Sequence, residues 1–273
     1  MNEKTYNEVV DEKSPRIKQL YWNIAFGLQA VDGLKPSKYM VRLSDEHIKG
    51  EKTYNQVQNE ITSYYSENIN ASNNEKEADE VSTAIYEILS DKSFRFDYLT
   101  YKNYHKKLFQ NLDNRIYHHG EFRTANLTKD EPILNNETVE YQSWDMIEES
   151  LKYDFEEERN IDYINFNNEE LINRISEFTS RIWQVHPFFE GNTRTTAIFI
   201  QKYLNSMGFD INNDLFKDNS LYFRNSLVRA NYQNYAKGIK ADKKYLNMFF
   251  ENLLFNKNNV LNNNELYIDN NLN

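Results

Sequence analysis

Apolar side chains recur at helical spacing along most of the chain. Ser14 followed by Pro15 predicts a helix start, because the serine can cap the helix and proline is tolerated in its first turn. Ser37 and Thr53 precede two further segments with the same periodicity. The pattern therefore predicts a short N-terminal helical module over residues 1–66.

The next stretch interrupts this pattern. Residues 67–80 are polar and lack regularly spaced apolar positions, which is typical of a linker or an exposed loop. Helical spacing resumes over residues 81–256, where we expect one main domain. Its strongest apolar stripe runs over residues 171–185 and leads directly to His186. Residues 257–273 are rich in asparagine and predict a polar C-terminal tail.

One segment of the main domain departs from helical spacing. Residues 120–143 contain a proline, several β-branched residues and an Asn-Asn pair between two short extended runs. This composition favours a small β-hairpin. The predicted fold is therefore mainly α, a helical bundle with one small β-hairpin, preceded by the short N-terminal helical module.

Composition and charge narrow the functional classes. The 273 residues include only 7 glycines and 4 prolines, which argues against a turn-dense all-β fold, and no cysteine, which excludes disulfides and thiolate metal sites. The net charge of −10 argues against nonspecific nucleic-acid binding. No run approaches the roughly 20 apolar residues that span a bilayer. We therefore expect a cytoplasmic protein with neither a membrane nor a nucleic acid as its direct partner.

The candidate chemistry lies in residues 186–194, His-Pro-Phe-Phe-Glu-Gly-Asn-Thr-Arg, between two predicted helices. His186 can accept a proton near neutral pH. Glu190 is a hard oxygen ligand suited to Mg²⁺, which proteins usually bind through one or two carboxylates together with substrate phosphates. The following helix presents free N–H groups to an anion, and Arg194 adds a guanidinium group. Together these residue types indicate phosphate chemistry.

This loop resembles the signature of the Fic family, H-P-F-x-(D/E)-G-N-G-R-x-x-R. The matching residues are His186, Pro187, Phe188, Glu190, Gly191, Asn192 and Arg194. Two further segments resemble the family. They are Gly120-Glu-Phe-Arg-Thr124 before the predicted hairpin, and Leu227 with Arg229-Ala-Asn-Tyr232 near the end of the domain. The resemblance covers roughly residues 81–256 and implies a Fic-type helical bundle.

The resemblance also implies an activity, that of a protein adenylyltransferase, which transfers AMP from ATP to a hydroxyl group of a target protein. It implies that His186 is the general base and that Glu190 holds Mg²⁺ between the phosphates. Nucleotide contacts are implied for Gly191, Asn192, Thr193, Arg194, Asn231 and Tyr232. The hairpin would act as a flap that binds the target by strand addition. Its implied docking residues are Lys129, Asp130, Glu131 and Pro132.

Two positions depart from the signature. Thr193 stands in place of glycine, and Ala197 stands in place of the second arginine. In the family that arginine steadies the γ-phosphate and pairs with an inhibitory glutamate. Its replacement puts ATP affinity, the choice of nucleotide and the usual inhibitory switch in question.

The N-terminal module resembles the small antitoxin proteins that partner some Fic toxins and carry an inhibitory helix of pattern (S/T)-x-x-x-E-(G/N). The aligned positions hold Leu28, Asp32 and Gly33. A literal match to the pattern occurs at Ser63, Glu67 and Asn68. Asp32 is one methylene shorter than glutamate, and Ala197 offers it no partner. We therefore expect no strong ion pair between these two positions and a switch that has decayed on both sides.

Two other functions remain open at this point. A Fic fold with an altered phosphate loop could transfer UMP, phosphocholine or phosphate, and Thr193 and Ala197 keep that alternative open. The other is a nucleotide-binding regulator without catalysis, although a pure binder has no use for a base at His186. The expected partners are Mg-ATP and a target protein with a Ser, Thr or Tyr hydroxyl, the chain itself included, and self-association is a further expectation.

Overall fold

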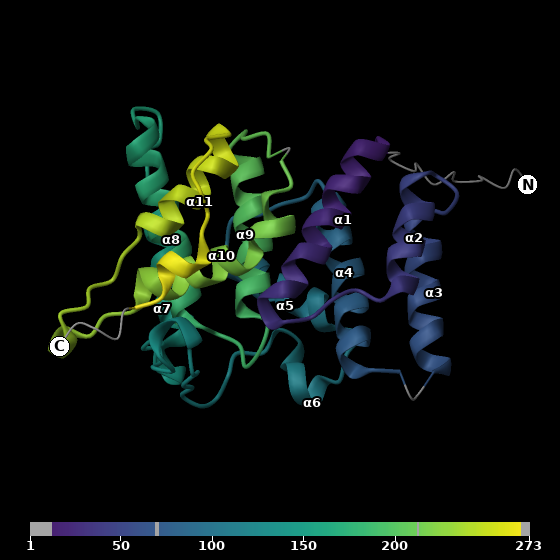
Figure 1. Cartoon of the computed structure of the whole chain (residues 1–273), viewed down its shortest axis with the longest axis horizontal. Helices are drawn as coiled ribbons and strands as arrows, with labels where there is room; N and C mark the ends of the chain where they lie inside the picture. The colour runs from purple at the N-terminus through teal and green to yellow at the C-terminus, as the bar shows by residue number, and fades with distance from the viewer. Residues whose placement is uncertain (1–12, 69–70, 212, 269–273) are drawn as a thin grey trace, which may run out of the picture.

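The computed structural model describes residues 13–68, 71–211 and 213–268, and this part of the chain is mainly helical (Figure 1). Its α-helices are α1 (Pro15–Gln29), α2 (Lys38–Ile48), α3 (Tyr54–Glu67), α4 (Asn73–Ser90), α5 (Tyr98–Phe109), α6 (Asn114–Tyr117), α7 (Ile147–Arg159), α8 (Asn168–Val185), α9 (Asn192–Ser206), α10 (Leu215–Asn231) and α11 (Lys244–Phe255). Its 3₁₀ turns are η1 (Ala30–Asp32), η2 (His118–Gly120), η3 (Pro132–Leu134), η4 (Trp144–Met146), η5 (Tyr235–Lys237) and η6 (Asn263–Leu266). No helix in these ranges is long and apolar enough to cross a membrane.

The first helix, α1, packs directly on the helices of the main domain. Its start follows from the sequence, because Ser14 accepts a hydrogen bond from the Ile17 N–H and Pro15 occupies the first turn. α1 lies against α4 and α10 (Figure 1). The crossing with α10 is close, since a Cβ atom at Gly27 would lie 2.3 Å from the Phe216 carbonyl oxygen. The N-terminal helices therefore share one hydrophobic core with the rest of the chain.

The linker predicted over residues 67–80 is wrong in its second half, because α4 begins at Asn73. The reason is a buried polar contact. The Asp79 carboxylate accepts hydrogen bonds from the Ser37 N–H (2.8 Å), the Ser37 hydroxyl (2.6 Å) and the Tyr65 hydroxyl (2.7 Å). These donors offset the cost of burying the carboxylate and fasten α2 and α3 to α4.

α9 runs through the middle of the helical assembly (Figure 1). Every residue from Asn192 to Leu204 is buried, and α4, α5 and α8 pack around the helix. The apolar stripe predicted over residues 171–185 is confirmed as the buried face of α8. The two helices that flank the loop over residues 186–194 are therefore both held by the core.

The β-hairpin predicted over residues 120–143 is not formed. The described residues contain no strand, and this segment has only an isolated antiparallel bridge between Glu131 and Glu137. The turn itself is present, since Asn135 and Asn136 both adopt left-handed backbone conformations with φ of 56° and 66°. The chain therefore reverses direction here without the paired strands of a hairpin.

The backbone groups of this segment are bound by other partners. The Lys129 N–H donates to the Thr138 hydroxyl (3.0 Å). The Ile133 carbonyl accepts from the Ile268 N–H (2.9 Å) in the C-terminal segment. Because these bonds already satisfy backbone groups, the segment gains less from a strand ladder.

The same contact modifies the prediction of a polar tail over residues 257–273. Leu266 and Ile268 are buried, so these two side chains belong to the core. Residues 269–273 lie outside the described residues.

Two histidines are buried as hydrogen-bond acceptors in the core. The Trp22 indole N–H donates to His47 Nδ1 (3.0 Å), and the Gly120 N–H donates to His105 Nδ1 (3.0 Å). Burial lowers the pKa of His47 to about 4 and that of His105 to about 3. Both rings are therefore neutral in the folded protein at pH values where an unfolded chain would protonate them.

We predict that acidification destabilises the fold. Below about pH 6.5 the unfolded chain binds protons at these histidines and the folded chain does not, so the free energy of unfolding falls as the pH falls. Each histidine contributes a slope of up to about 1.4 kcal/mol per pH unit in the window from about pH 6.5 down to its folded pKa. Urea denaturation of the wild type and of His105→Gln at several pH values would measure this. The variant should show a smaller slope, and equal slopes would contradict the prediction.

Candidate active site

The loop over residues 186–194 has a left-handed residue at each end. His186 caps the C-terminus of α8 with φ of 48°, and Gly191 caps the N-terminus of α9 with φ of 74°. A Cβ atom at Gly191 would lie 2.2 Å from the Phe109 ring, so glycine is required by both its conformation and its surroundings. A histidine at positive φ is uncommon, and such backbone strain persists only where the surrounding structure enforces it.

Side chains within the loop hold its shape. The Asn192 amide accepts from the Phe188 N–H (3.0 Å) and donates to the Phe188 carbonyl (2.8 Å). The Thr193 hydroxyl accepts from the Trp183 indole N–H (3.0 Å). Thr193 is the second residue of α9 and has no positive φ, so glycine is not needed there. With these side chains engaged, the free N–H groups of the first turn of α9 are the groups suited to an anion.

Two residues that the sequence did not identify as site residues support the loop. Arg123 is buried and donates to the carbonyls of His186 (2.7 Å) and Ala125 (2.6 Å). His105 Nε2 donates to the Glu190 carbonyl (3.1 Å). Arg123 belongs to the segment whose family resemblance was noted above, which was the available signal. His105 offered none, because a lone histidine on an apolar helix face is most often structural.

The His186 ring is buried and neutral. It stacks on Tyr141 with ring centroids 3.9 Å apart, and its Nδ1 has no hydrogen-bond partner among the described residues. Burial, together with the positive charges of Lys129 and Arg123, lowers the pKa of His186 to about 3. The imidazole is therefore unprotonated at physiological pH, and its Nδ1 is not engaged by another described residue.

Two adjoining cavities form a cleft beside the loop. One, of about 440 Å³, lies over His186 and the start of α9. The other, of about 740 Å³, extends between η1, α4 and α10. Asp32, Lys129 and Glu190 line both. Arg194 and Arg224 line the larger cavity together with Glu77 and Asp130, so the cleft holds three cationic and four acidic side chains.

Arg194 is held by residues that lie far from it in the sequence. Its side chain is 1% exposed, and its Nε lies 2.9 Å from the Asp32 carboxylate. Its Nη2 donates to Glu77 (2.7 Å) and its Nη1 donates to the Gln29 amide oxygen (3.2 Å). Asp32 therefore does have an arginine partner. The family pattern pairs this carboxylate with position 197, whereas η1 places it against Arg194 in the first turn of α9.

The other residues of the inhibitory patterns lie in different places. Gly33 ends η1 with φ of 70° and lines the larger cavity. The literal match lies at the end of α3, and none of its residues lines either cavity. Those residues are Ser63, Glu67 and Asn68.

Glu190 lies in the cleft near Asp32. Partial burial and the neighbouring Asp32 carboxylate raise the pKa of Glu190, while Lys129 and Arg194 oppose that rise. The described residues contain no group of three or more acidic, histidine or cysteine side chains that could hold a metal. Mg²⁺ commonly takes one or two protein carboxylates and completes its shell with phosphate oxygens and water. The cleft therefore fits Mg²⁺ as a companion of a bound phosphate chain.

The predicted docking residues separate into two groups. Lys129, Asp130 and Pro132 are exposed and line the cleft. Glu131 is buried, and its carboxylate lies 2.6 Å from Arg224 Nη2 on α10. Glu131 is therefore inaccessible to a docking partner in this conformation, which corrects the expectation for that residue.

The structure does not bring the predicted adenosine contacts into the cleft. The Asn231 amide bonds with Ser180 and with the Leu227 carbonyl. The Tyr232 hydroxyl donates to the Glu137 carboxylate (2.5 Å). Neither Asn231 nor Tyr232 lines either cavity.

The segment around the loop is similar to a known protein family. Residues 95–204 match the sequence model of the Fic/DOC family. No curated protein matches the chain, and no solved structure matches it either. The matched segment runs from just before α5 into α9 and leaves out α1 to α4, α10 and α11. Residues 95–204, which contain the loop from His186 to Arg194, are therefore similar to the Fic/DOC family.

Proposed function

We propose that this protein is a protein adenylyltransferase that transfers AMP from Mg-ATP to a hydroxyl group of a target protein, itself included. A Fic domain supports a transferase at the coarser level. The observation that carries the finer proposal is the arrangement of the loop. A neutral, buried His186 faces the same cavity as the free N–H groups at the start of α9.

The reaction that this arrangement suits is an in-line displacement. The target hydroxyl oxygen forms a bond to the α-phosphorus of ATP while the bond from that phosphorus to the bridging oxygen of the β-phosphate breaks. The hydroxyl proton passes to the imidazole of His186, and pyrophosphate leaves. Glu190 would hold Mg²⁺, which neutralises phosphate charge when bound.

The charges around His186 suggest that bound ATP would also raise the proton affinity of this base. Lys129 and Arg123 disfavour a protonated His186 in the free protein. A triphosphate in the cleft would bring negative charge close to these cations and offset them, which raises the proton affinity of His186. The base would then be strongest when the nucleotide is present.

Binding also requires a rearrangement around Arg194. Its guanidinium is engaged by Asp32 and Glu77, so phosphate oxygens must compete with these two carboxylates. Lys129 lines the same cleft and would contribute positive charge where the signature has a second arginine and this chain has Ala197. Arg224 also lines the cleft, but it would first have to leave Glu131. These contacts support binding of a polyphosphate.

ATP labelled in the α-phosphate or in the γ-phosphate tests the proposal. Incubation of the purified protein with Mg²⁺ and each form should leave label on protein only from the α-position. Label from the γ-position only would identify a phosphate transferase. No label from either would favour a different donor, such as one carrying UMP or phosphocholine, or a regulator without catalysis.

The base is tested by His186→Ala. We predict a loss of label transfer of about 10²- to 10⁴-fold, the range typical of a general base, with nucleotide affinity changed less than about threefold. His119→Ala is a suitable control, because that histidine lies outside the loop and bonds to the Leu112 carbonyl. Equal transfer by His186→Ala and wild type would contradict the assignment.

The metal contact is tested by Glu190→Gln, which keeps the shape of the side chain and removes its charge. We predict at least about a tenfold loss of transfer and a higher Mg²⁺ requirement for ATP binding, only partly restored by excess Mg²⁺. Isothermal titration calorimetry with Mg-ATP measures the affinity for the nucleotide independently of transfer activity. Glu121→Gln removes the same charge from an exposed position and should behave as wild type. An unchanged Mg²⁺ dependence in Glu190→Gln would exclude Glu190 as the ligand.

The Asp32 contact makes a further prediction. Asp32→Ala removes one of the carboxylates that compete with phosphate for Arg194, so ATP affinity should rise by about threefold to tenfold. Adding Glu77→Gln should raise it further. Asp45→Ala, an exposed aspartate on α2, is the matched control. An ATP affinity in Asp32→Ala equal to that of the control would show that this ion pair does not oppose nucleotide binding.

A further inference from the structure

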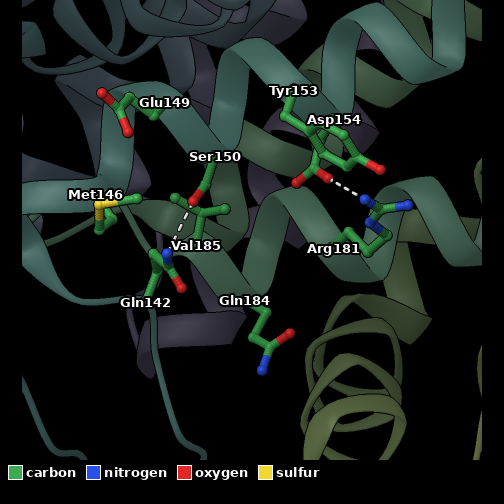
Figure 2. Close-up of a pocket in the computed structure, with 9 residues that line it drawn as sticks. All are labelled: Gln142, Met146, Glu149, Ser150, Tyr153, Asp154, Arg181, Gln184 and Val185. Atoms are coloured by element: carbon green, nitrogen blue, oxygen red, sulfur yellow. Dashed lines mark hydrogen bonds and ion pairs between the residues drawn. The ribbon is translucent and has the colours of Figure 1, made fainter.

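A separate cavity of about 430 Å³ lies between α7, the C-terminal part of α8 and the segment that precedes η4 (Figure 2). This cavity and the catalytic cavity are lined by neighbouring residues of the same two chain segments. Tyr141 and His186 line the catalytic cavity, whereas their sequence neighbours Gln142 and Val185 line this one. An extended peptide spans about 3.3 Å per residue, so a peptide that passes over these segments could contact both cavities.

The walls of this cavity offer hydrogen-bond acceptors. The Gln142 amide N–H donates to the Ser150 hydroxyl (2.8 Å), and the Gln184 amide N–H donates to the Glu140 carbonyl (3.0 Å). Neither amide oxygen accepts a hydrogen bond from another described residue. Glu149 also lines the cavity and forms no ion pair within the described part of the chain. The free acceptors in the wall are therefore two amide oxygens and one carboxylate, and the wall also holds the hydroxyls of Ser150 and Tyr153.

The one cation in the wall is already neutralised. Arg181 lies 2.6 Å from Asp154 and also pairs with Glu157. Figure 2 marks the contact with Asp154 by a dashed line. The Arg181 guanidinium covers the Tyr153 ring at 5.5 Å. Because Glu149 has no cationic partner, the cavity wall carries one uncompensated negative charge. We therefore expect its ligand to be a cation with several N–H donors.

The rim of the cavity has the composition of a protein-contact surface. Met146 and Tyr153 line the cavity and are 41% and 62% exposed, and Trp144, two residues before Met146 in the sequence, is 47% exposed. Tryptophan, tyrosine and methionine are enriched where proteins bind one another. An apolar rim around acidic acceptors fits a side chain presented by a polypeptide better than a small free cation.

We propose that this cavity binds an arginine or lysine side chain of the protein substrate, a few residues from the hydroxyl that is presented to His186. The proposal rests on the proposed transfer to a protein hydroxyl and adds a basic residue as a requirement of the target segment. Glu149 and the oxygens of Gln142 and Gln184 accept its N–H groups.

Fluorescence anisotropy with two labelled synthetic peptides tests this. Both are short glycine–alanine peptides with a central serine, flanked by arginines in one and by norleucines in the other. We expect the wild type to bind the arginine peptide at least about fivefold more tightly. Glu149→Gln should remove most of that preference. Glu149 is exposed, so the variant should keep its fold. Glu156→Gln removes the same charge from α7 outside the cavity and should retain the preference.

Two outcomes would overturn the proposal. One is equal binding of the two peptides by the wild type. The other is the same loss in Glu149→Gln and Glu156→Gln, which would indicate general attraction to an acidic helix. Anisotropy needs neither ATP nor turnover, so failure of docking is distinguishable from failure of transfer, which the labelled nucleotides report separately.

Discussion

The ion pairs of Arg194 connect the N-terminal helices to the candidate active site. Asp32 follows α1, Glu77 lies in the first half of α4, and Arg194 lies in the first turn of α9. A guanidinium this deeply buried needs charged partners, because an unpaired buried charge is costly. The same pairing occupies the arginine that a phosphate chain would use. In the proposed function, a bound nucleotide would therefore compete with Asp32 and Glu77 for this one side chain.

Packing contacts fix the backbone conformation of the loop beside Arg194. Gly191 lies against the Phe109 ring, where a Cβ atom would clash, and Arg123 donates a hydrogen bond to the carbonyl of His186. These contacts keep His186 in a backbone conformation that histidine seldom adopts. The same burial keeps the imidazole neutral. Position and protonation state thus have a common physical origin in the packing around the loop.

The sequence allowed the helices and the loop to be predicted, because caps such as Ser14 and the stripe of α8 are local signals. Predictions from the sequence were wrong where the hydrogen-bond partners of a polar group lie far away in the chain. The start of α4 contains Asp79 and was predicted to be a linker because the segment is polar. The three hydrogen bonds that allow Asp79 to be buried come from Ser37 and Tyr65, which the local sequence does not reveal. The partners of Arg194 could not be found from the motif, because Asp32 and Glu77 lie more than a hundred residues away. The predicted hairpin is not formed, and the Ile133 carbonyl in that segment accepts a hydrogen bond from the Ile268 N–H, a partner that local sequence signals do not reveal.

The central claim is that the first turn of α9 and Arg194 bind the phosphates of ATP opposite His186. A crystal structure of His186→Ala with Mg²⁺ and α,β-methylene ATP tests it most directly. We expect the phosphates at the N–H groups of Asn192 to Arg194, with the Arg194 guanidinium turned from Asp32 and Glu77 toward a phosphate oxygen. A nucleotide bound outside this cleft, or Arg194 still held by both carboxylates with the nucleotide in place, would contradict the account.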